Sequence, residues 1–408
     1  MTDHKQPGSD PNSTRDALAA FGPLRVVELG TWLAAPSAAA LFADLGAEVI
    51  KVEPASGDPL RKFPGSMRGG EEQSPGFTLL NRHKKSVTLD ITTDAGRQEL
   101  DTLLAAADVL ITNMRNGALE RASLDPVSVT QRFPRLVYGS LTGLGLSGPD
   151  RERPGFDTGA FWARSGMLHQ VTADGSEPLA PVGGYGDLMT SLSLFSATMV
   201  ALFDREKTGR GGIVEASLLQ TGGWLLSGDV AAQSAFGRAP KARPRAKSST
   251  PLVNTYQTAD HRWFFLTAVE AGRHLDSVCR AIDRPELSRD ERFTGASAMR
   301  TNAAALIAIF DEAFLQKNLE YWTERFDREG VWWEKVATPA ELMQDRQVAA
   351  NDMVGDLAFG PSVIRAVLAP FRILGRRSTK ASLAPELGAD TQALLGREAV
   401  KPAVRRAS

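Results

Sequence analysis

The side chains of this 408-residue chain that could do chemistry are acids and cations in the connections between predicted strands. The acid that stands out is Asp157, which follows a Gly/Pro loop and precedes the aromatic residues Phe161 and Trp162. An aspartate in front of a helix is a good N-cap. An exposed aspartate, with a pKa of about 4, is also an anionic nucleophile at neutral pH and needs no general base. The local sequence supports the two roles equally.

Three cations, Arg82, Lys84 and Lys85, stand together directly before a predicted strand. Such a run is often no more than a solvated face. Its functional interpretation is a clamp that neutralises a phosphorylated ligand. Arg115 lies in a later loop that the predicted topology brings to the same edge of the sheet, and it supports the clamp.

The sequence lacks the residue patterns of metal sites and of serine hydrolases. The five histidines show no metal-ligand spacing such as HExxH, and no GxSxG nucleophile elbow occurs. A single cysteine, Cys279, excludes both an intramolecular disulfide and a CxxC metal site. We therefore expect no metal.

A dinucleotide site is disfavoured as well. The segment GLGLSG, 143–148, matches the spacing GxGxxG, but PDRERPG follows it where a helix would have to begin. In the first strand-to-helix turn, GTWLAAP, Trp32 and Leu33 would block the close backbone approach of a pyrophosphate.

The elements that must position these residues alternate between strand and helix patterns. Strands are expected at Leu24–Leu29, Ala47–Glu53, Ser86–Ile91, Asp108–Asn113 and Arg135–Thr142, with helices at Pro36–Gly46, Thr93–Ala107 and Val127–Arg132. This alternation predicts an α/β fold with a doubly wound parallel sheet. Because ligands of such sheets bind beyond the carboxyl ends of the strands, the loops after Leu29, Glu53, Ile111 and Leu141 are the candidate site.

The chain is long enough for two domains. We expect a disordered tail at 1–22, a large domain at 23–225, a small domain with linkers at 226–345, and a final linker with a C-terminal segment at 346–408. The large domain should include a helix from Asp157 to Leu168 and a long apolar helix from Leu188 to Arg205. The small domain should begin with an exposed linker, 237–251, followed by a hairpin and helices.

Charge and hydropathy exclude some partners. The chain has 47 Lys+Arg against 48 Asp+Glu, so it lacks the positive excess of a nucleic-acid-binding protein. Its N-terminus has no apolar signal region, and its longest mostly apolar stretch, Leu192–Phe203, is too short to span a bilayer. We expect a cytoplasmic protein that binds neither nucleic acid nor membrane.

Taken together, the motifs resemble those of family III CoA-transferases. They include RVVELGTWLAAPSAAALFADLGAEVIKVEPASGDPLR, NRHKKSVTLDI, ADVLITNMRNGALE, LVYGSLTGLGLSGPDRERPGFD and VGGYGDLMTSLSLFSATMVALFDREKTGRGG. The resemblance runs from about Leu24 to Gly396 with the motifs in the family's order. RPGFDTGAFWARSGM looks most like the branch that acts on 2-hydroxy acids such as phenyllactate or 2-hydroxyisocaproate.

The resemblance implies a Rossmann-like large domain, a smaller α+β domain, a C-terminal segment that returns to the large domain, and two chains interlocked as a homodimer. It implies acyl-CoA and carboxylic acid substrates and no cofactor beyond the CoA thioester itself. Asp157 matches the aspartate that becomes acylated. CoA would lie against Trp32, Leu33, Ala34, Lys84, Lys85, Asn113, Met114 and Arg115.

In the implied reaction an aspartate attacks the acyl-CoA thioester, and the anhydride and aspartyl-CoA thioester that follow transfer CoA to a second acid. Backbone N–H groups of the glycine-rich loop suit the oxyanions, so Gly183, Gly184 and Gly186 are candidates, with Asp187 beside them. Water must be kept away from an anhydride.

Two alternatives remain. The same fold hosts α-methylacyl-CoA racemases, which carry a His at the position of Phe156 and a second acid at the position of Asp187. Phenylalanine cannot transfer a proton, which favours the transferase. A non-catalytic CoA-binding homologue is the other alternative. The chain also has Leu33 and Thr142 where some family members have Gln and Lys, so CoA contacts there should differ.

Overall fold

The computed structural model describes residues 22–63, 74–371 and 383–399. The predicted disordered tail, 1–22, lies outside these residues except for Gly22. The described chain forms two compact units. We call them the large unit (within 1–168, 180–238 and 347–408) and the small unit (169–179 and 239–346).

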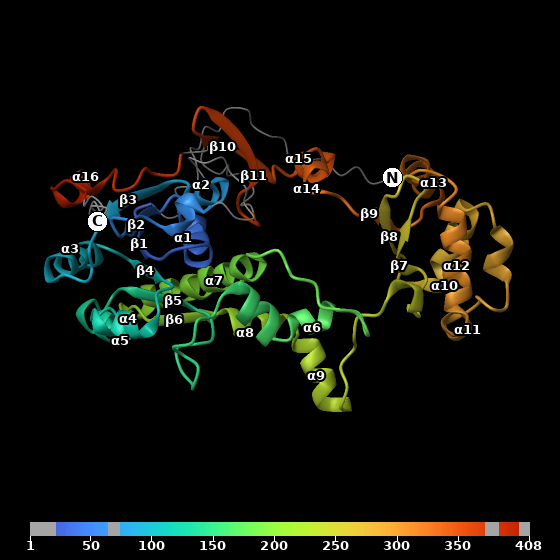
Figure 1. Cartoon of the computed structure of the whole chain (residues 1–408), viewed down its shortest axis with the longest axis horizontal. Helices are drawn as coiled ribbons and strands as arrows, with labels where there is room; N and C mark the ends of the chain where they lie inside the picture. The colour runs from blue at the N-terminus through green and yellow to red at the C-terminus, as the bar shows by residue number, and fades with distance from the viewer. Residues whose placement is uncertain (1–21, 64–73, 372–382, 400–408) are drawn as a thin grey trace, which may run out of the picture. The chain divides into compact units, whose positions relative to one another are not determined.

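The large unit is built on a six-stranded sheet in the order β3-β2-β1-β4-β5-β6, with every neighbouring pair parallel (Figure 1). The strands are β1 (Arg25–Leu29), β2 (Glu48–Glu53), β3 (Lys84–Thr88), β4 (Val109–Thr112), β5 (Val137–Thr142) and β6 (Ile213–Ser217). The predicted α/β class is therefore confirmed. Strand order reverses between β1 and β4, and the crevice at such a switch point is where these sheets bind ligands.

Both faces of the sheet are covered, as the alternation of β1 requires. Val26 packs into a core with α1 (Ala34–Asp44) and α7 (Tyr185–Thr208). Val27 belongs to the opposite core, which includes α3 (Asp94–Ala105) and α5 (Pro126–Arg132). Every residue of α1 is buried, because its many alanines let it lie close to the sheet and to α7.

Several elements of the large unit were not predicted. These are β6, α2 (Pro75–Asn81), α4 (Asn116–Arg121), α8 (Leu218–Leu225), α9 (Ser227–Phe236), α15 (Arg346–Ala350), α16 (Thr391–Leu395) and an antiparallel hairpin of β10 (Val354–Phe359) and β11 (Ser362–Val367). The hairpin occupies a stretch that we expected to be a long connection. The segment around α16 runs along the edge strand β3, where Gly388 and Asp390 hydrogen-bond to Ser86. This part of the C-terminal segment therefore contacts the sheet of the large unit.

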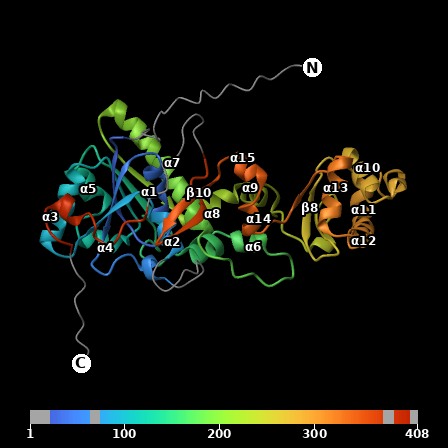
Figure 2. The same cartoon turned by 90° about the horizontal axis from the view of Figure 1, so that it is seen from above.

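The small unit pairs a three-stranded antiparallel sheet, in the order β7-β8-β9, with helices (Figure 2). Its elements are β7 (Val253–Gln257), β8 (Trp263–Thr267), β9 (Trp333–Lys335), α10 (Ala271–Ala281), α11 (Ala296–Thr301), α12 (Ala303–Phe314), α13 (Leu319–Glu329) and α14 (Pro339–Leu342). The hairpin was predicted and β9 was not. The boundaries also differ from the predicted 226–345, because α9 belongs to the large unit and 169–179 to the small one.

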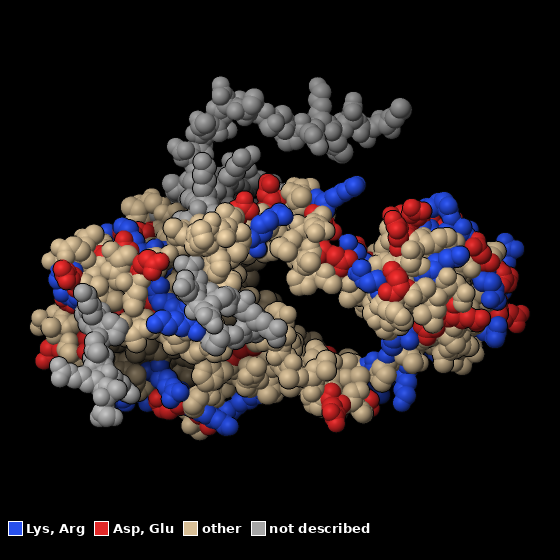
Figure 3. All heavy atoms as spheres, turned by 45° about the horizontal axis from the view of Figure 1, so that its top comes forward, with Lys and Arg blue, Asp and Glu red and all other residues tan. Residues whose placement is uncertain are grey.

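The surface of the folded chain carries charges of both signs, as its near-neutral composition predicts. Figure 3 shows acidic and basic side chains interspersed on the displayed face rather than gathered into one basic stripe. Among the described residues, α7 is the one helix long and apolar enough to cross a membrane. In this fold it packs on α1, β5 and β6 as a covering helix of the sheet.

Candidate active site

A cavity of about 720 Å³ opens at the switch point of the sheet. Its walls come from the turn after β1, the loop after β4, the end of β5 and the amino end of α7. These elements bring together many of the residues predicted to bind ligand: Trp32, Leu33, Ala34, Asn113, Met114, Arg115 and Asp187. Thr142 and Phe156 line it as well.

The turn after β1 is held in an unusual conformation. Asn113 fastens it to the end of β4, since its Oδ1 accepts from the Thr31 N–H (3.0 Å) and its Nδ2 donates to the Thr31 carbonyl (2.8 Å). A Cβ at Gly30 would lie 3.0 Å from this amide oxygen, so the close approach depends on glycine. Trp32 has a φ of 65°, a left-handed conformation that costs a non-glycine residue on the order of 1–3 kcal/mol.

The phosphate clamp predicted at Arg82 and Lys84 is wrong, because both cations are buried in ion pairs. The Lys84 side chain is 0% exposed, and its Nζ lies 2.6 Å from Glu28 Oε2. It also donates to the carbonyl of Pro36 and to Asn81. Arg82 pairs with buried Asp44. Burial lowers the pKa of Lys84 to about 8 against the opposing effect of Glu28. Of the three cations, Lys85 keeps a partly exposed side chain, paired with Glu48.

The cavity is lined by other arginines, not by Arg82 or Lys84. Arg115, Arg151 and Arg153 are among its walls. Arg151 is paired with Glu120 (3.1 Å), whereas no described residue pairs with the side chains of Arg115 and Arg153. Arg115 was predicted from the sequence and Arg153 was not, because the alternating charges of the segment 150–153, DRER, are typical of a solvated loop.

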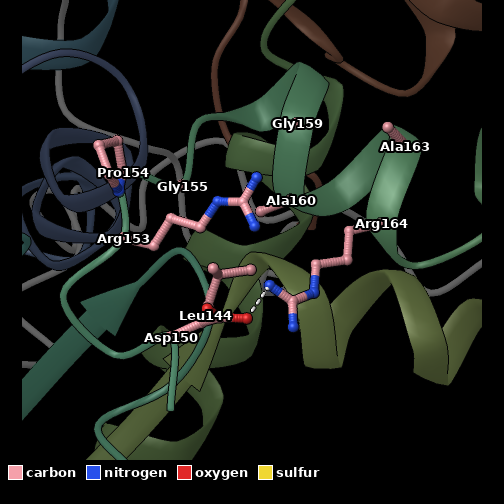
Figure 4. Close-up of a pocket in the computed structure, with 9 residues that line it drawn as sticks. All are labelled: Leu144, Asp150, Arg153, Pro154, Gly155, Gly159, Ala160, Ala163 and Arg164. Carbon is pink, nitrogen blue, oxygen red and sulfur yellow. Dashed lines mark ion pairs between the residues drawn. The ribbon is translucent and has the colours of Figure 1, made fainter. Parts of the chain in front are cut away.

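A second cavity, of about 510 Å³, shares Arg153, Pro154 and Gly155 with the first. Figure 4 shows the Arg153 guanidinium directed toward Ala160, while Arg164 points to Asp150. The Arg164–Asp150 pair is 2.6 Å long, so its charges cancel. Arg153 is therefore the uncompensated charge shared by both cavities.

Asp157 begins a π-helix, η2 (Asp157–Arg164), and turns its carboxylate to another helix. Its Oδ2 accepts from the Gly184 N–H (3.0 Å) and its Oδ1 from the Asp187 N–H (3.1 Å). Both donors belong to the amino end of α7, where unpaired N–H groups and the helix dipole stabilise an anion. Asp157 thus caps α7 rather than its own helix. It is 6% exposed, and two residues next to it, Phe156 and Asp187, line the cavity.

The glycine-rich loop fits tightly around this cap. A Cβ at Gly186 would lie 2.2 Å from Phe161 Cγ and 2.5 Å from Asp157 Oδ1. Gly184 has a φ of 101°, which favours glycine. Gly183 is different, because a Cβ there would meet no atom within 4 Å. Two of the three predicted glycines are therefore needed for the packing at Asp157.

Asp187 lies on the cavity wall, beside Asp157. Burial, together with the charge of Asp157, raises the pKa of Asp187 to about 7. Near neutral pH this carboxyl exists in both protonation states. Such a group is suited to proton transfer.

The raised pKa of Asp187 predicts a pH-dependent stability. Below about pH 4 the group is protonated in both the folded and unfolded states. Between that pH and about 7 the unfolded chain ionises it while the folded chain does not, so its contribution to stability falls as the pH rises. Asp187→Asn should therefore melt at a higher temperature than the wild type at pH 8, with the gain vanishing near pH 4. Calorimetry at both pH values measures this, and an equal effect at both would contradict the raised pKa.

Asp174 and Glu177 are exposed acids in the segment between Phe156 and Asp187. Asp174 lies in a turn after α6 (Met167–Val171), and its side chain is 76% exposed. Lys241 Nζ lies 2.9 Å from Asp174 Oδ1 and lowers the pKa of the carboxyl. Asp174 and Lys241 belong to the small unit, and neither residue lines the two cavities.

The cavity at the switch point, with Arg115, Arg153 and Asp187 on its wall, lies where open α/β sheets bind their ligands. Residues 23–391 match the model of CoA-transferase family III. The (R)-2-hydroxy-4-methylpentanoate CoA-transferase of Clostridioides difficile is 32% identical over 333 residues, 81% of this chain and 83% of that one. The cinnamoyl-CoA:phenyllactate CoA-transferase of Clostridium sporogenes is 30% identical, covering 85% of both chains. A CAIB/BAIF family protein from Brucella suis has a TM-score of 0.81 at 30% identity, covering 91% of this chain and 97% of that one.

The chain therefore belongs to CoA-transferase family III, and the family resemblance seen in the sequence is confirmed. It is an enzyme of the CoA-transferase class. Among the described residues, no group of three or more His, Cys, Asp or Glu could hold a metal ion.

Proposed function

We propose that this enzyme moves CoA from an acyl-CoA to a carboxylic acid through an acylated aspartate, with the switch-point cavity as the CoA site. The observation that carries the proposal is the cavity of about 720 Å³, in which the predicted CoA-binding loops meet two unpaired arginines. Arg115 and Arg153 would bind the phosphates of CoA, since guanidinium groups match phosphate geometry. Trp32 and Met114 would offer apolar surface to the rest of the nucleotide.

The departures at Leu33 and Thr142 fit this assignment. Leu33 lines the cavity as an apolar side chain. The Thr142 hydroxyl accepts from the Gly145 N–H (3.0 Å) and lies 3.2 Å from Glu215 Oε1. It holds the loop after β5 and supplies no positive charge, so the phosphates depend on the arginines.

Asp157 would be the covalent nucleophile, as the family resemblance implies. Phe156, the residue before it, and Asp187, whose N–H it accepts, both line the cavity. The Gly184 N–H (3.0 Å) and the Asp187 N–H (3.1 Å) hold its carboxylate in one orientation. These N–H groups at the amino end of α7 would stabilise the oxyanions that form on the aspartyl carbonyl.

The reaction begins when the aspartate carboxylate adds to the thioester, and loss of CoA thiolate leaves an acyl-aspartyl anhydride. The thiolate attacks the aspartyl carbonyl and releases the first acid as a carboxylate, which leaves aspartyl-CoA. The acceptor carboxylate attacks that thioester, and the thiolate then attacks the acceptor carbonyl of the new anhydride. The aspartate is regenerated and the new acyl-CoA leaves, with no net proton or electron consumed.

We further propose that the acids are 2-hydroxy or aryl-substituted acids, because two relatives are named for 2-hydroxy-4-methylpentanoate and phenyllactate. The test incubates the enzyme with a panel of acyl-CoA donors and carboxylates and follows CoA exchange by mass spectrometry. Transfer to at least one 2-hydroxy acid supports the proposal. Absence of transfer with every donor and acceptor, from a folded enzyme that binds CoA, would contradict it.

Arg115 and Arg153 should contribute more to CoA binding than Lys85, the partly exposed residue of the predicted phosphate clamp. Replacing Arg115 or Arg153 by Ala should raise the KM for acyl-CoA by about tenfold, the equivalent of about 1.4 kcal/mol of phosphate binding, with a smaller change in kcat. Lys85→Ala is the control, because Lys85 is partly exposed and paired with Glu48. Steady-state kinetics compares the three. A larger increase in KM for Lys85→Ala than for either arginine variant would instead support phosphate binding by the predicted clamp.

The racemase-like alternative is favoured by one observation, the Asp187 carboxyl with a pKa of about 7 on the cavity wall. A single acid of this kind could exchange an α-proton of the bound acyl group. Incubation with acyl-CoA in deuterated water distinguishes the functions. Deuterium at the α-carbon without CoA transfer would replace the transferase by the alternative.

We also propose that the enzyme is a cytoplasmic homodimer. Large apolar side chains of the large unit are exposed on α7 and α9, among them Val200 (69%), Phe203 (65%) and Phe236 (76%). Such surface on a described unit is typical of a region covered in an assembly. Sedimentation velocity at low protein concentration should show a dimer. An active monomer would contradict the interlocked architecture.

A further inference from the structure

Trp32 places an aromatic side chain in the cavity wall with a backbone conformation that needs support. Its φ is 65°, and its indole lies edge-on to Phe63 with ring centroids 5.2 Å apart. Both rings line the cavity. A left-handed tryptophan persists where its surroundings hold it. The groups that hold it are therefore candidates for controlling the cavity.

Asp58 holds the Trp32 backbone directly. Its Oδ1 accepts from the Trp32 N–H (3.2 Å) and from the Leu60 N–H (2.9 Å). Its own N–H donates to Glu53 Oε2 (3.0 Å). Asp58 is 2% exposed, so solvent cannot take over these contacts.

Lys51, on β2, contacts both Asp58 and Gly30, the residue at which the turn carrying Trp32 begins. Its Nζ lies 2.9 Å from Asp58 Oδ2, 2.6 Å from Glu28 Oε1 and 3.0 Å from the carbonyl oxygen of Gly30. The side chains of Lys51, Glu28 and Asp58 are 0% exposed. Buried ion pairs contribute little net stability compared with apolar side chains of similar volume. What this ammonium provides is geometry, because it ties Gly30, at the start of the turn that carries Trp32, to Asp58, which accepts the Trp32 N–H.

We propose that Lys51 is a positioning residue for CoA binding, which acts through Asp58 and Gly30 to hold Trp32 against the ligand. The proposal rests on the proposed function, since it takes the cavity to be the CoA site. Lys51 does not reach the cavity itself. Its loss should therefore weaken ligand binding and leave the reacting groups in place.

Lys84 offers a matched control. It is also a fully buried lysine paired with Glu28, at the same N···O distance of 2.6 Å. Its other contacts are the Pro36 carbonyl in α1 and the Asn81 side chain in α2. Lys84→Met and Lys51→Met therefore both leave Glu28 with one lysine, but only the second frees Asp58 and the turn.

The experiment measures the dissociation constant of CoA by titration calorimetry, and KM and kcat with an accepted acyl-CoA. Lys51→Met should raise the dissociation constant and KM by about tenfold or more, with kcat changed less than about threefold. Lys84→Met should leave both within about twofold of the wild type. Unchanged CoA binding in Lys51→Met, or an equal loss in both variants, would overturn the proposal.

If Lys51→Met does not fold, Asp58→Asn takes its place. An asparagine keeps the acceptor for the Trp32 N–H but loses the charge that pairs with Lys51, so it should raise the CoA dissociation constant in the same way. Unchanged binding by a folded Asp58→Asn enzyme would overturn the proposal. A wild type that binds no CoA would instead contradict the proposed function, so the two failures are distinguishable.

Discussion

Asp157→Asn should lower the rate of CoA transfer by several orders of magnitude while the fold survives. An amide is a poor nucleophile and cannot form the acyl anhydride on which transfer depends. Asparagine is nearly as large as aspartate, and its amide oxygen still accepts one of the two N–H groups of α7, so the loss of stability should be about 1 kcal/mol. Initial rates of CoA transfer, with circular dichroism as the check on folding, measure this.

Asp174→Asn is the control. Asp174 is an exposed acid of the small unit that lines neither cavity, so its substitution should leave transfer within about twofold of the wild type. Glu177→Gln, which removes another exposed acid of the same segment, should also leave transfer unchanged. If Asp157→Asn retains transfer, or Asp174→Asn abolishes it in a folded enzyme, Asp157 is not the nucleophile.

Gly186→Ala should have the second large effect. Its Cβ would lie 2.2 Å from Phe161 Cγ and 2.5 Å from Asp157 Oδ1, distances that real atoms do not adopt. The amino end of α7 must then shift, which breaks the Asp157 cap and moves Asp187 in the cavity wall. Overpacking of this kind costs about 1–3 kcal/mol, so we expect a lower melting temperature and a large loss of activity.

Gly183→Ala is the matched control for Gly186→Ala. A Cβ at Gly183 meets nothing within 4 Å, and the residue is exposed. Thermal melts and transfer rates should therefore stay close to the wild type. Equal behaviour of the two variants would mean that the packing around Asp157 does not control the site.

The parallel sheet could be predicted because buried parallel strands read as short apolar runs, such as Leu24–Leu29, separated by helix patterns. Strand β6 was missed because its burial is uneven, with Ile213 and Glu215 exposed. The hairpin of β10 and β11 was missed for the same reason, since it has few buried positions to impose an alternating pattern. In both cases pairing with a neighbouring strand, rather than a local pattern, decides the structure.

The site was predictable where residues line loops at the ends of strands, as at Trp32 and Asn113, because topology alone brings those loops together. It was not predictable where burial decides the role of a charge. Lys84 was assigned to phosphate binding from its residue type, yet it pairs with Glu28 in the core, and the contact of Asp157 with Gly184, 27 residues away, was not predicted. No local signal marks such long-range partners.

The central claim is a covalent aspartyl intermediate, and trapping it is the most direct measurement. The enzyme is incubated with an accepted acyl-CoA and then with hydroxylamine, which converts an acylated aspartate or aspartyl-CoA thioester into a hydroxamate. Peptide mapping by mass spectrometry locates the label. We expect inactivation that depends on acyl-CoA, with one hydroxamate at Asp157. A label at another acid such as Asp187 or Asp174 would contradict the assignment of the nucleophile, and no label in an enzyme that transfers CoA would contradict the covalent mechanism itself.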